Sequence, residues 1–209
     1  MREEVDAVVE AAGSAPGYKG LRNRAFLLLL AETGARVNAL RTLDGTDCVE
    51  MPDGTLRAFV HEKGKRRKRE IELSPPAAAA LRAYATAYNR GAIAAGWASR
   101  IRLGQLGPVW RNSSRSCWPY PNVLACLRHT CALAGVAPFT PHALRRAFAS
   151  DAASILSRHE VALAGNWQGL DRLDEHYISL RPFELAHRLA HPPSLPPAVP
   201  LESIPYVST

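Results

Sequence analysis

The sequence lacks an apolar run long enough to cross a lipid bilayer, which takes about 18–20 residues. Its longest such stretch, residues 25–31, has the length expected of a buried segment within a core helix. Residues 1–4 are partly acidic and carry no apolar core of the kind found in secretory signal peptides. These features exclude an integral membrane protein and predict a cytoplasmic location.

The sequence also lacks the cysteine spacing of a metal site. It contains no Cys-x-x-Cys pair and no Cys/His cluster that resembles a zinc site. We therefore expect reduced, mostly buried thiols, and neither a metal nor another cofactor. The cysteines concerned are Cys48, Cys117, Cys126 and Cys131.

Acidic residues are in deficit, with 19 Asp and Glu against 26 Lys and Arg and a formal net charge of +7. A basic excess favours a polyanionic partner, either a nucleic acid or an anionic membrane surface. Hydrophobic residues make up 47% of the 209-residue chain. This is enough to form the core of one domain, or of a domain with a tail.

Apolar spacing and turn residues predict an α+β domain that is mainly helical, with a small three-stranded antiparallel sheet. Residues 13–20 are expected to form a loop, and residues 91–106 fit either continued helix or an insertion. Prolines preclude a packed helix after residue 190, which divides the chain into a domain (1–190) and a proline-rich tail (191–209). Strands are expected at residues 47–50, 56–61 and 70–73. Helices are expected at residues 2–12, 21–33, 35–40, 74–90, 122–134, 158–163 and 182–189, after Thr140, and around Tyr177.

A histidine and two arginines stand where an anion could bind. His142 and Arg145 lie on one face of a helix whose first turn leaves backbone N–H groups unpaired, and such groups attract phosphate. Arg36, at a junction between two helices, either reaches solvent or faces an anion. Together with Tyr177 they suggest attack of a phenol on a phosphate. The alternative is that the pair forms a solvated helix face and that Tyr177 is a half-buried aromatic residue.

Every residue from Lys63 to Arg69 except Gly64 is cationic, at the expected tip of a β-hairpin. One interpretation is a solubilising loop. The other, which the density of charge favours, is contact with a nucleic-acid backbone.

Several strings follow one another along the chain in a characteristic order. RNRAFL (22–27) and TGARV (33–37) come first, followed by EKGK (62–65) and REIEL (69–73). TPHALRRAFA (140–149) then carries a His-x-x-Arg spacing, and Tyr177 closes the series. In this order the strings resemble the catalytic domain of the tyrosine recombinases, the phage integrase family, over residues 2–189.

The resemblance implies a site-specific recombinase that cleaves and rejoins double-stranded DNA through a 3′-phosphotyrosine intermediate, without a metal. It also implies a homo-oligomer on DNA, held together through the C-terminal segment. The catalytic residues it implies are Tyr177, Arg36, Arg145, His142 and Lys63, with Trp167 or Asn166 as a further phosphate ligand. The DNA contacts it implies are Lys65, Arg66, Arg67, Lys68, Arg69 and Arg146.

The sequence departs from the family pattern in particular places. Gly165-Asn166-Trp167 stands where the family usually has Gly-His, and Ala39 replaces an acidic residue that often follows the first arginine. The usual N-terminal core-binding domain is also missing from the sequence. Two alternatives therefore stay open: a catalytically impaired DNA-binding remnant of an integrase, and a DNA-relaxing enzyme like the type IB topoisomerases.

Overall fold

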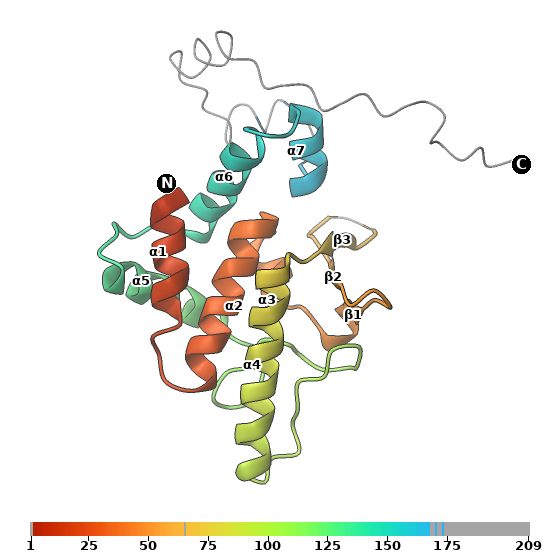
Figure 1. Cartoon of the computed structure of the whole chain (residues 1–209), viewed down its shortest axis with the longest axis vertical. Coiled ribbons are helices and arrows are strands. Elements are labelled where there is room, and N and C mark those ends of the chain that lie inside the picture. Colours follow the sequence, from red (N-terminus) through yellow and green to blue (C-terminus); the bar gives the residue numbers. More distant parts are fainter. Residues whose placement is uncertain (1, 65, 168–169, 171–172, 174–209) are drawn as a thin grey trace, which may run out of the picture. The chain divides into compact units, whose positions relative to one another are not determined.

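The computed structural model describes residues 2–64, 66–167, 170 and 173, all of which belong to one compact unit that ends at Ile178 (Figure 1). Lys65, Tyr177 and the predicted helix at 182–189 lie outside the described residues. So does the predicted tail at 191–209, and the domain boundary at residue 190 therefore stays a prediction.

The described residues form a mainly helical fold with one small antiparallel sheet, as predicted from the sequence. The strands are β1 (Cys48–Glu50), β2 (Leu56–Val60) and β3 (Arg69–Glu72). A short 3₁₀ helix, Gly45–Asp47, precedes the sheet. The α-helices are α1 (Arg2–Ala12), α2 (Tyr18–Thr33), α3 (Val37–Arg41), α4 (Pro75–Ala94), α5 (Tyr120–Leu133), α6 (Pro141–Ala152) and α7 (Arg158–Gly165).

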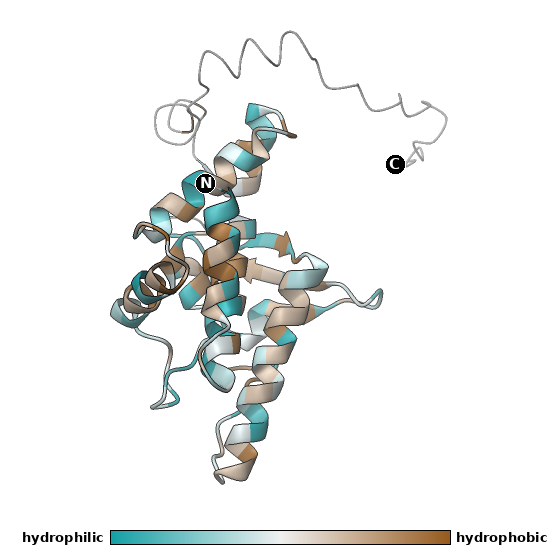
Figure 2. Cartoon of the chain, turned by 60° about the vertical axis from the view of Figure 1, so that its left-hand side comes forward, coloured by the Kyte–Doolittle hydropathy of each residue, from teal (hydrophilic) through white to brown (hydrophobic). Residues whose placement is uncertain are grey.

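Helix α2 lies at the centre of the helical packing, in contact with α1, α4 and α6. Most of its apolar residues, including Phe26, Leu27 and Leu30, are almost fully buried. Figure 2 shows the most hydrophobic residues gathered in the interior and the hydrophilic ones toward the periphery. Because α6 carries the predicted His-x-x-Arg string and packs on α2, the core fixes the position of that string relative to the end of α2.

The sheet has the order β1-β2-β3, and both pairs are antiparallel. Leu56, Ala58 and Val60 of β2 face the core, because alternate residues of a strand point to the same side. On the other face, Arg57 forms ion pairs with Glu70 at 2.6 Å and with Glu72 at 3.6 Å. The cationic loop therefore connects two paired strands, β2 and β3, between Val60 and Arg69.

Aromatic residues hold the long connection between α4 and α5 against the helices. Trp110 is fully buried and stacks on Tyr84 with ring centroids 5.7 Å apart. Its indole nitrogen donates a hydrogen bond of 2.8 Å to the carbonyl of Leu40. The Tyr84 hydroxyl donates to the carbonyl of Val109 and accepts from the backbone N–H of Arg111. The connection is therefore an ordered part of the core.

Several predicted helix bounds differ from the structure, and at two of them the predicted helix stops short of a glycine that the structure includes in the helix. Helix α2 begins at Tyr18, inside the predicted loop, and α7 continues to Gly165. A Cβ at Gly20 would lie 2.1 Å from the carbonyl oxygen of Ala15, and one at Gly165 would overlap the Trp167 ring. Gly20 therefore allows the preceding loop to approach α2 closely, and Gly165 allows the Trp167 ring to pack against the last residue of α7.

The predicted burial of the cysteines holds for two of the four, and Cys117 and Cys126 are half-buried. None of the four forms a disulfide, and two of them, Cys48 and Cys131, are buried. Burial raises the pKa of the Cys48 thiol to about 12, so this side chain stays protonated at neutral pH. Within the described ranges, every helix is too short or too polar to cross a membrane.

Candidate functional site

Several of the predicted catalytic side chains lie around one pocket of about 530 Å³. They come from three separate parts of the chain: the α2–α3 junction, the loop between β2 and β3, and the first turns of α6. No Asp or Glu is among the described residues that line the pocket. The predicted residues that line it are Arg36, Lys63, His142 and Arg145.

A glycine turn at the end of α2 places Arg36 at the pocket. Gly34 adopts the left-handed conformation with φ 57°, and its backbone N–H donates to the carbonyl of Leu30. The chain then reverses into α3, with Arg36 as the residue that precedes the helix and an exposed side chain. The sequence prediction of a helix–helix junction at Gly34 is therefore confirmed.

Replacing Gly34 with alanine is expected to destabilise the fold by about 3 kcal/mol, from backbone strain together with overpacking. The φ angle of 57° disfavours any side chain, and a Cβ would lie 2.3 Å from a ring carbon of Phe148 on α6. Denaturant unfolding of the variant and the parent protein measures this difference.

Gly135 offers a matched control, because it has a similar φ of 67° but a Cβ added there would meet no atom within 4 Å. Gly135→Ala is expected to cost only about 1 kcal/mol, the backbone contribution alone. Equal losses in the two variants would show that the contact with Phe148 does not constrain the α2–α3 turn.

Helix α6 begins as the sequence predicts. The Thr140 side chain accepts a hydrogen bond from the backbone N–H of Ala143, and Pro141 occupies the first turn. His142 is exposed and Arg145 is 4% exposed, and both line the pocket. The positive end of the helix dipole points in the same direction, which favours an anion in this position.

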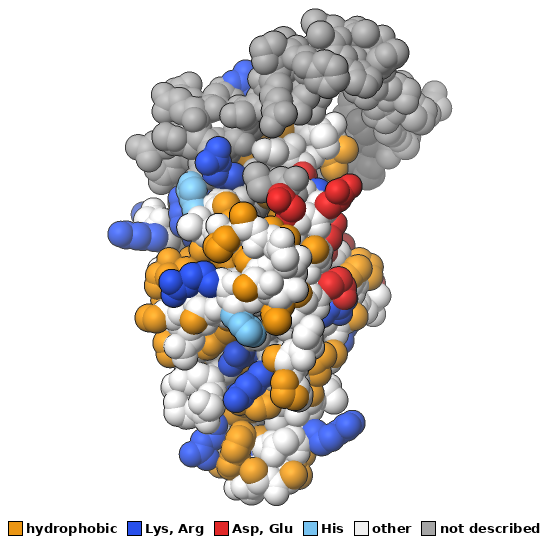
Figure 3. Space-filling model, turned by 90° about the vertical axis from the view of Figure 1, so that its left-hand side faces the viewer, with side chains coloured by type: hydrophobic (Ala, Val, Ile, Leu, Met, Phe, Trp, Pro, Cys, Tyr) orange, Lys and Arg blue, Asp and Glu red, His pale blue; other side chains and the backbone are white. Residues whose placement is uncertain are grey.

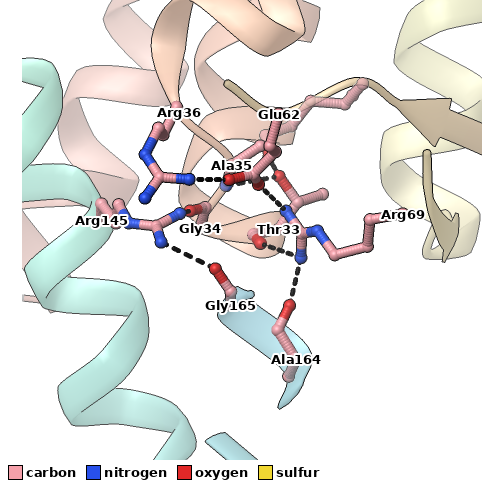
Figure 4. Close-up of polar contacts among 10 residues, drawn as sticks. Thr33, Gly34, Ala35, Arg36, Glu62, Arg69, Arg145, Ala164 and Gly165 are labelled. Atoms are coloured by element: carbon pink, nitrogen blue, oxygen red, sulfur yellow. Dashed lines mark hydrogen bonds and ion pairs between the residues drawn. The ribbon is translucent and has the colours of Figure 1, made fainter. Parts of the chain in front are cut away.

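The buried guanidinium of Arg145 connects α6 to two other segments (Figure 4). Its Nη1 donates to the carbonyl of Gly34, and its Nη2 donates to the carbonyl of Gly165 at 2.7 Å. The ring of Trp167 lies against the same group, with 4.2 Å between the guanidinium carbon and the ring centroid. Contacts on several sides leave this guanidinium little freedom to rotate.

Neither residue proposed in place of the family histidine lines the pocket. Trp167 stacks between Arg145 and Phe148, with the two aromatic centroids 6.3 Å apart. Asn166 ends α7 in the left-handed conformation with φ 55°, and its backbone N–H bonds to carbonyls of that helix. The structure thus places Trp167 behind Arg145.

The cationic loop divides into side chains that face outward and side chains that are already paired. Lys63 is exposed at the pocket, and Arg66 and Arg67 are exposed farther along the loop. Lys68 forms an ion pair with Asp47, which lies just before β1. Lys65 lies outside the described residues.

Arg69, predicted as a DNA contact, turns inward instead of toward the exposed side of the loop. Its side chain is 11% exposed and pairs with the buried carboxylate of Glu62. Arg146, the remaining predicted contact, is exposed on α6. On the face that Figure 3 shows, Lys and Arg side chains are spread over the surface rather than gathered in one patch.

Sequence reasoning missed three residues at or beside the pocket. His61 and Tyr120 line it, and Glu62 is fully buried next to it. Strand alternation could have revealed Glu62, because every second residue of this segment, Ala58, Val60 and then Glu62, is buried. No local signal points to Tyr120, because it reaches the pocket from the start of α5.

The arrangement is suited to binding a phosphate group. Two guanidiniums lie at the pocket with a lysine and a histidine. Guanidiniums can donate paired hydrogen bonds to the oxygens of a phosphate, and an imidazole can donate or accept a proton.

Two comparisons relate the chain to known proteins, one by sequence family and one by structure. A sequence model described as the phage integrase family matches residues 1–181. Among curated protein sequences, none matches the chain significantly. The remaining comparison, with solved structures, gives similar folds at low sequence identity.

XerA recombinase has a TM-score of 0.68 at 19% identity, with 93% of this chain and 64% of the other covered. XerH site-specific recombinase, bound to its difH substrate before cleavage, has a TM-score of 0.68 at 17% identity, with 90% and 52% covered. A lambda integrase dimer bound to a COC′ core site has a TM-score of 0.59 at 16% identity, with 85% and 47% covered. The chain therefore spans about half to two thirds of the length of these structures.

Proposed function

The chain belongs to the phage integrase family, whose sequence model matches residues 1–181, and its described part has the fold of a tyrosine recombinase catalytic domain. We propose that it cleaves and rejoins DNA strands at specific sites through a 3′-phosphotyrosine intermediate formed by Tyr177. The observation that carries this proposal is the convergence of Arg36, Lys63, His142 and Arg145 on one pocket.

The two arginines act on the phosphate. Attack on a phosphodiester builds negative charge on its non-bridging oxygens, and preorganised guanidiniums stabilise that charge. Arg145 is held by two carbonyls and by the Trp167 ring, so its orientation is set before DNA binds. Arg36 reaches the same place from the start of α3, and its guanidinium lies beside that of Arg145 in Figure 4. Trp167 contributes by supporting Arg145.

Proton transfer completes the proposed reaction. The oxygen of Tyr177 attacks phosphorus, the new phosphorus–tyrosine bond forms, and the bond to the 5′ oxygen breaks. A tyrosine ordinarily titrates near pH 10, so a base must accept its proton, and His142 takes this role. Lys63 gives a proton to the leaving 5′ oxygen. A 5′-hydroxyl then reverses the steps, and because the covalent link conserves the bond energy, neither a metal nor ATP is required.

Duplex DNA is the proposed partner, and the exposed part of the cationic loop supplies contacts to its backbone. The variants Arg66→Ala and Arg67→Ala are each expected to weaken binding and to lower the slope of log affinity against log salt by about 1. Fluorescence anisotropy with labelled duplex DNA at several salt concentrations measures both quantities.

Arg90 provides a control of equal charge, because it is exposed on α4, which runs away from the sheet in Figure 1. Arg90→Ala is expected to leave the salt slope unchanged. An equal fall in all three variants would mean that net charge alone attracts the DNA, and the loop would have no particular role.

The proposed assembly is a homo-oligomer on DNA that forms through the C-terminal segment. Deleting residues 182–209 is expected to weaken assembly on DNA more than it weakens a single cleavage. Native gel shifts report assembly, and a nicked substrate reports cleavage in the same samples. Equal losses would argue against a role of this segment in assembly.

We also propose a cytoplasmic location for the protein.

The proposed function is tested by trapping the covalent intermediate. The substrates are nicked duplexes, made as a pool from the DNA that flanks the encoding gene, from which the cleaved strand end diffuses away. Because the chain spans only part of the length of the recombinases it matches, it is tested both alone and fused to a separate DNA-binding domain with its own site beside the nick. We expect a DNA-shifted band on a denaturing gel, and a nucleotide attached to the peptide that contains Tyr177.

The outcomes separate the candidate functions. A covalent band with exchange of strands between two duplexes supports a recombinase. A covalent band that only relaxes supercoiled DNA supports the topoisomerase-like alternative. DNA binding by the fusion without any covalent band would contradict the proposal and favour a binding remnant.

A further inference from the structure

A buried carboxylate lies directly behind the pocket. Glu62 is 0% exposed, although its neighbours His61 and Lys63 are exposed and line the pocket. It continues the inward phase of β2, next to Val60, whose cross-strand partner is Arg69. A carboxylate removed from water is costly unless cations and hydrogen bonds compensate it.

Each oxygen of Glu62 meets a different guanidinium (Figure 4). Oε2 accepts from Nη1 of Arg36, and Oε1 accepts from Nη2 of Arg69 at 3.2 Å. The side chain that the sequence assigned to catalysis and the one that it assigned to DNA binding thus share one buried partner. Glu62 itself does not line the pocket, and its two oxygens face guanidiniums.

Arg69 anchors this carboxylate to the rest of the fold. Its Nη1 donates to the carbonyl of Thr33 at 3.1 Å and to the carbonyl of Ala164, at the ends of α2 and α7. Burial lowers the pKa of Arg69, while the charge of Glu62 raises it and that of Arg145 lowers it. Glu62 therefore keeps a third guanidinium close to the two at the pocket.

Arg36 depends on this arrangement more than Arg145 does. Its side chain is 44% exposed, and among the described residues Glu62 is the one hydrogen-bond partner of its guanidinium. An exposed arginine without such a contact samples many rotamers, and fixing it costs conformational entropy when the phosphate arrives. Because the Arg36 guanidinium contacts Glu62 through one edge, its other N–H groups remain available to a phosphate.

We propose that Glu62 is a positioning residue, which holds the Arg36 guanidinium at the pocket while Arg69 holds Glu62 in place. The inference rests on the proposed function only in assigning Arg36 to the phosphate. The contact also connects Arg36 to the peptide that carries Lys63, so two groups of the site share one support.

The first test measures Arg36 itself and requires neither DNA nor activity. The protein is treated with an arginine-specific dicarbonyl reagent, and modification of each arginine is followed by peptide mass spectrometry. In Glu62→Gln, Arg36 is expected to react about fivefold faster, the effect of losing roughly one net hydrogen bond. Glu62→Asp keeps the carboxylate charge, and in this variant Arg36 is expected to react at an intermediate rate. Exposed Arg66 and Arg67 serve as internal references that do not change.

A second variant covers the case in which Glu62→Gln does not fold, since it leaves Arg69 buried without its carboxylate. The double variant Glu62→Gln/Arg69→Gln removes both buried charges and allows the two amides to bond. Thermal unfolding identifies the folded variants. Unchanged Arg36 reactivity in a folded variant that lacks the carboxylate would overturn the inference.

The second test is the single-turnover rate of covalent adduct formation. Loss of positioning is expected to lower this rate by about 10- to 100-fold, with little change in DNA affinity. Glu62→Asp should recover part of the rate. A wild-type protein that forms no adduct would defeat the proposed function, and the reactivity of Arg36 would still decide the role of Glu62. A wild-type adduct whose rate is unaffected in both Glu62 variants would overturn the inference and leave the function standing.

Discussion

Replacing Tyr177 with phenylalanine is expected to abolish the covalent protein–DNA adduct, because phenylalanine has no oxygen to attack phosphorus. The variant should still bind nicked DNA with unchanged affinity, since the phosphate ligands Arg36 and Arg145 are retained. A denaturing gel measures the adduct, and anisotropy measures binding in parallel. We expect the adduct to fall below the detection limit of the gel, although the variant lacks only one oxygen atom.

Tyr120 supplies the control that makes this result specific. It is the described tyrosine that lines the pocket, with 38% of its surface exposed. If the adduct disappears in Tyr177→Phe and persists in Tyr120→Phe, the nucleophile is the residue that the sequence order indicates. The opposite pattern would mean that the pocket uses a nucleophile from the start of α5, and the proposed assignment of Tyr177 would be wrong.

Much of the fold is predictable because its signals are local. Val5, Val8 and Val9 mark the buried side of α1 by their spacing, and all three are buried in the structure. Ser74 caps α4 through a hydrogen bond from the backbone N–H of Ala77, three residues away. Such elements depend on residues a few positions apart, and for these the sequence is a sufficient guide.

The candidate site was predictable to the extent that its residues occur in recognisable strings. The pocket brings together Arg36, Lys63, His142 and Arg145, which the sequence order had grouped. The support behind them was not predictable in this way. Glu62 and Arg36 are far apart in sequence, and the contact of Arg69 with Ala164 spans a still greater separation.

Arg69 illustrates why a run of like charges does not define a surface. Composition groups it with the cations of the loop, yet strand register pairs it with Val60, whose side chain faces the core. Cross-strand partners lie on the same face of a sheet, so the register turns Arg69 inward. The pairing of β2 with β3, rather than charge, therefore decides which cations of this segment remain available to DNA.

Replacing Arg145 with alanine is expected to lower the rate of adduct formation by about 10²- to 10³-fold, the usual effect of removing one donor to developing charge. The same change leaves the buried carbonyls of Gly34 and Gly165 without this donor, at a cost of about 1–3 kcal/mol for each unsatisfied group. Single-turnover rates, taken at a temperature where each variant is folded, are measured beside denaturant unfolding.

Arg146 is the matched control, since it is the next residue of α6, carries the same charge and is exposed. Arg146→Ala is expected to change the unfolding free energy by no more than about 0.5 kcal/mol, as is usual for surface positions. Arg145→Lys then separates charge from geometry, because one ammonium cannot span both carbonyls and also bind a phosphate in the way that a planar guanidinium does. If Arg145→Lys kept the wild-type rate, charge alone would suffice, and the contacts that hold this guanidinium would have no catalytic role. If Arg145→Lys were as slow as Arg145→Ala, the reaction would require the planar guanidinium of Arg145, which the carbonyls at the ends of α2 and α7 hold in place.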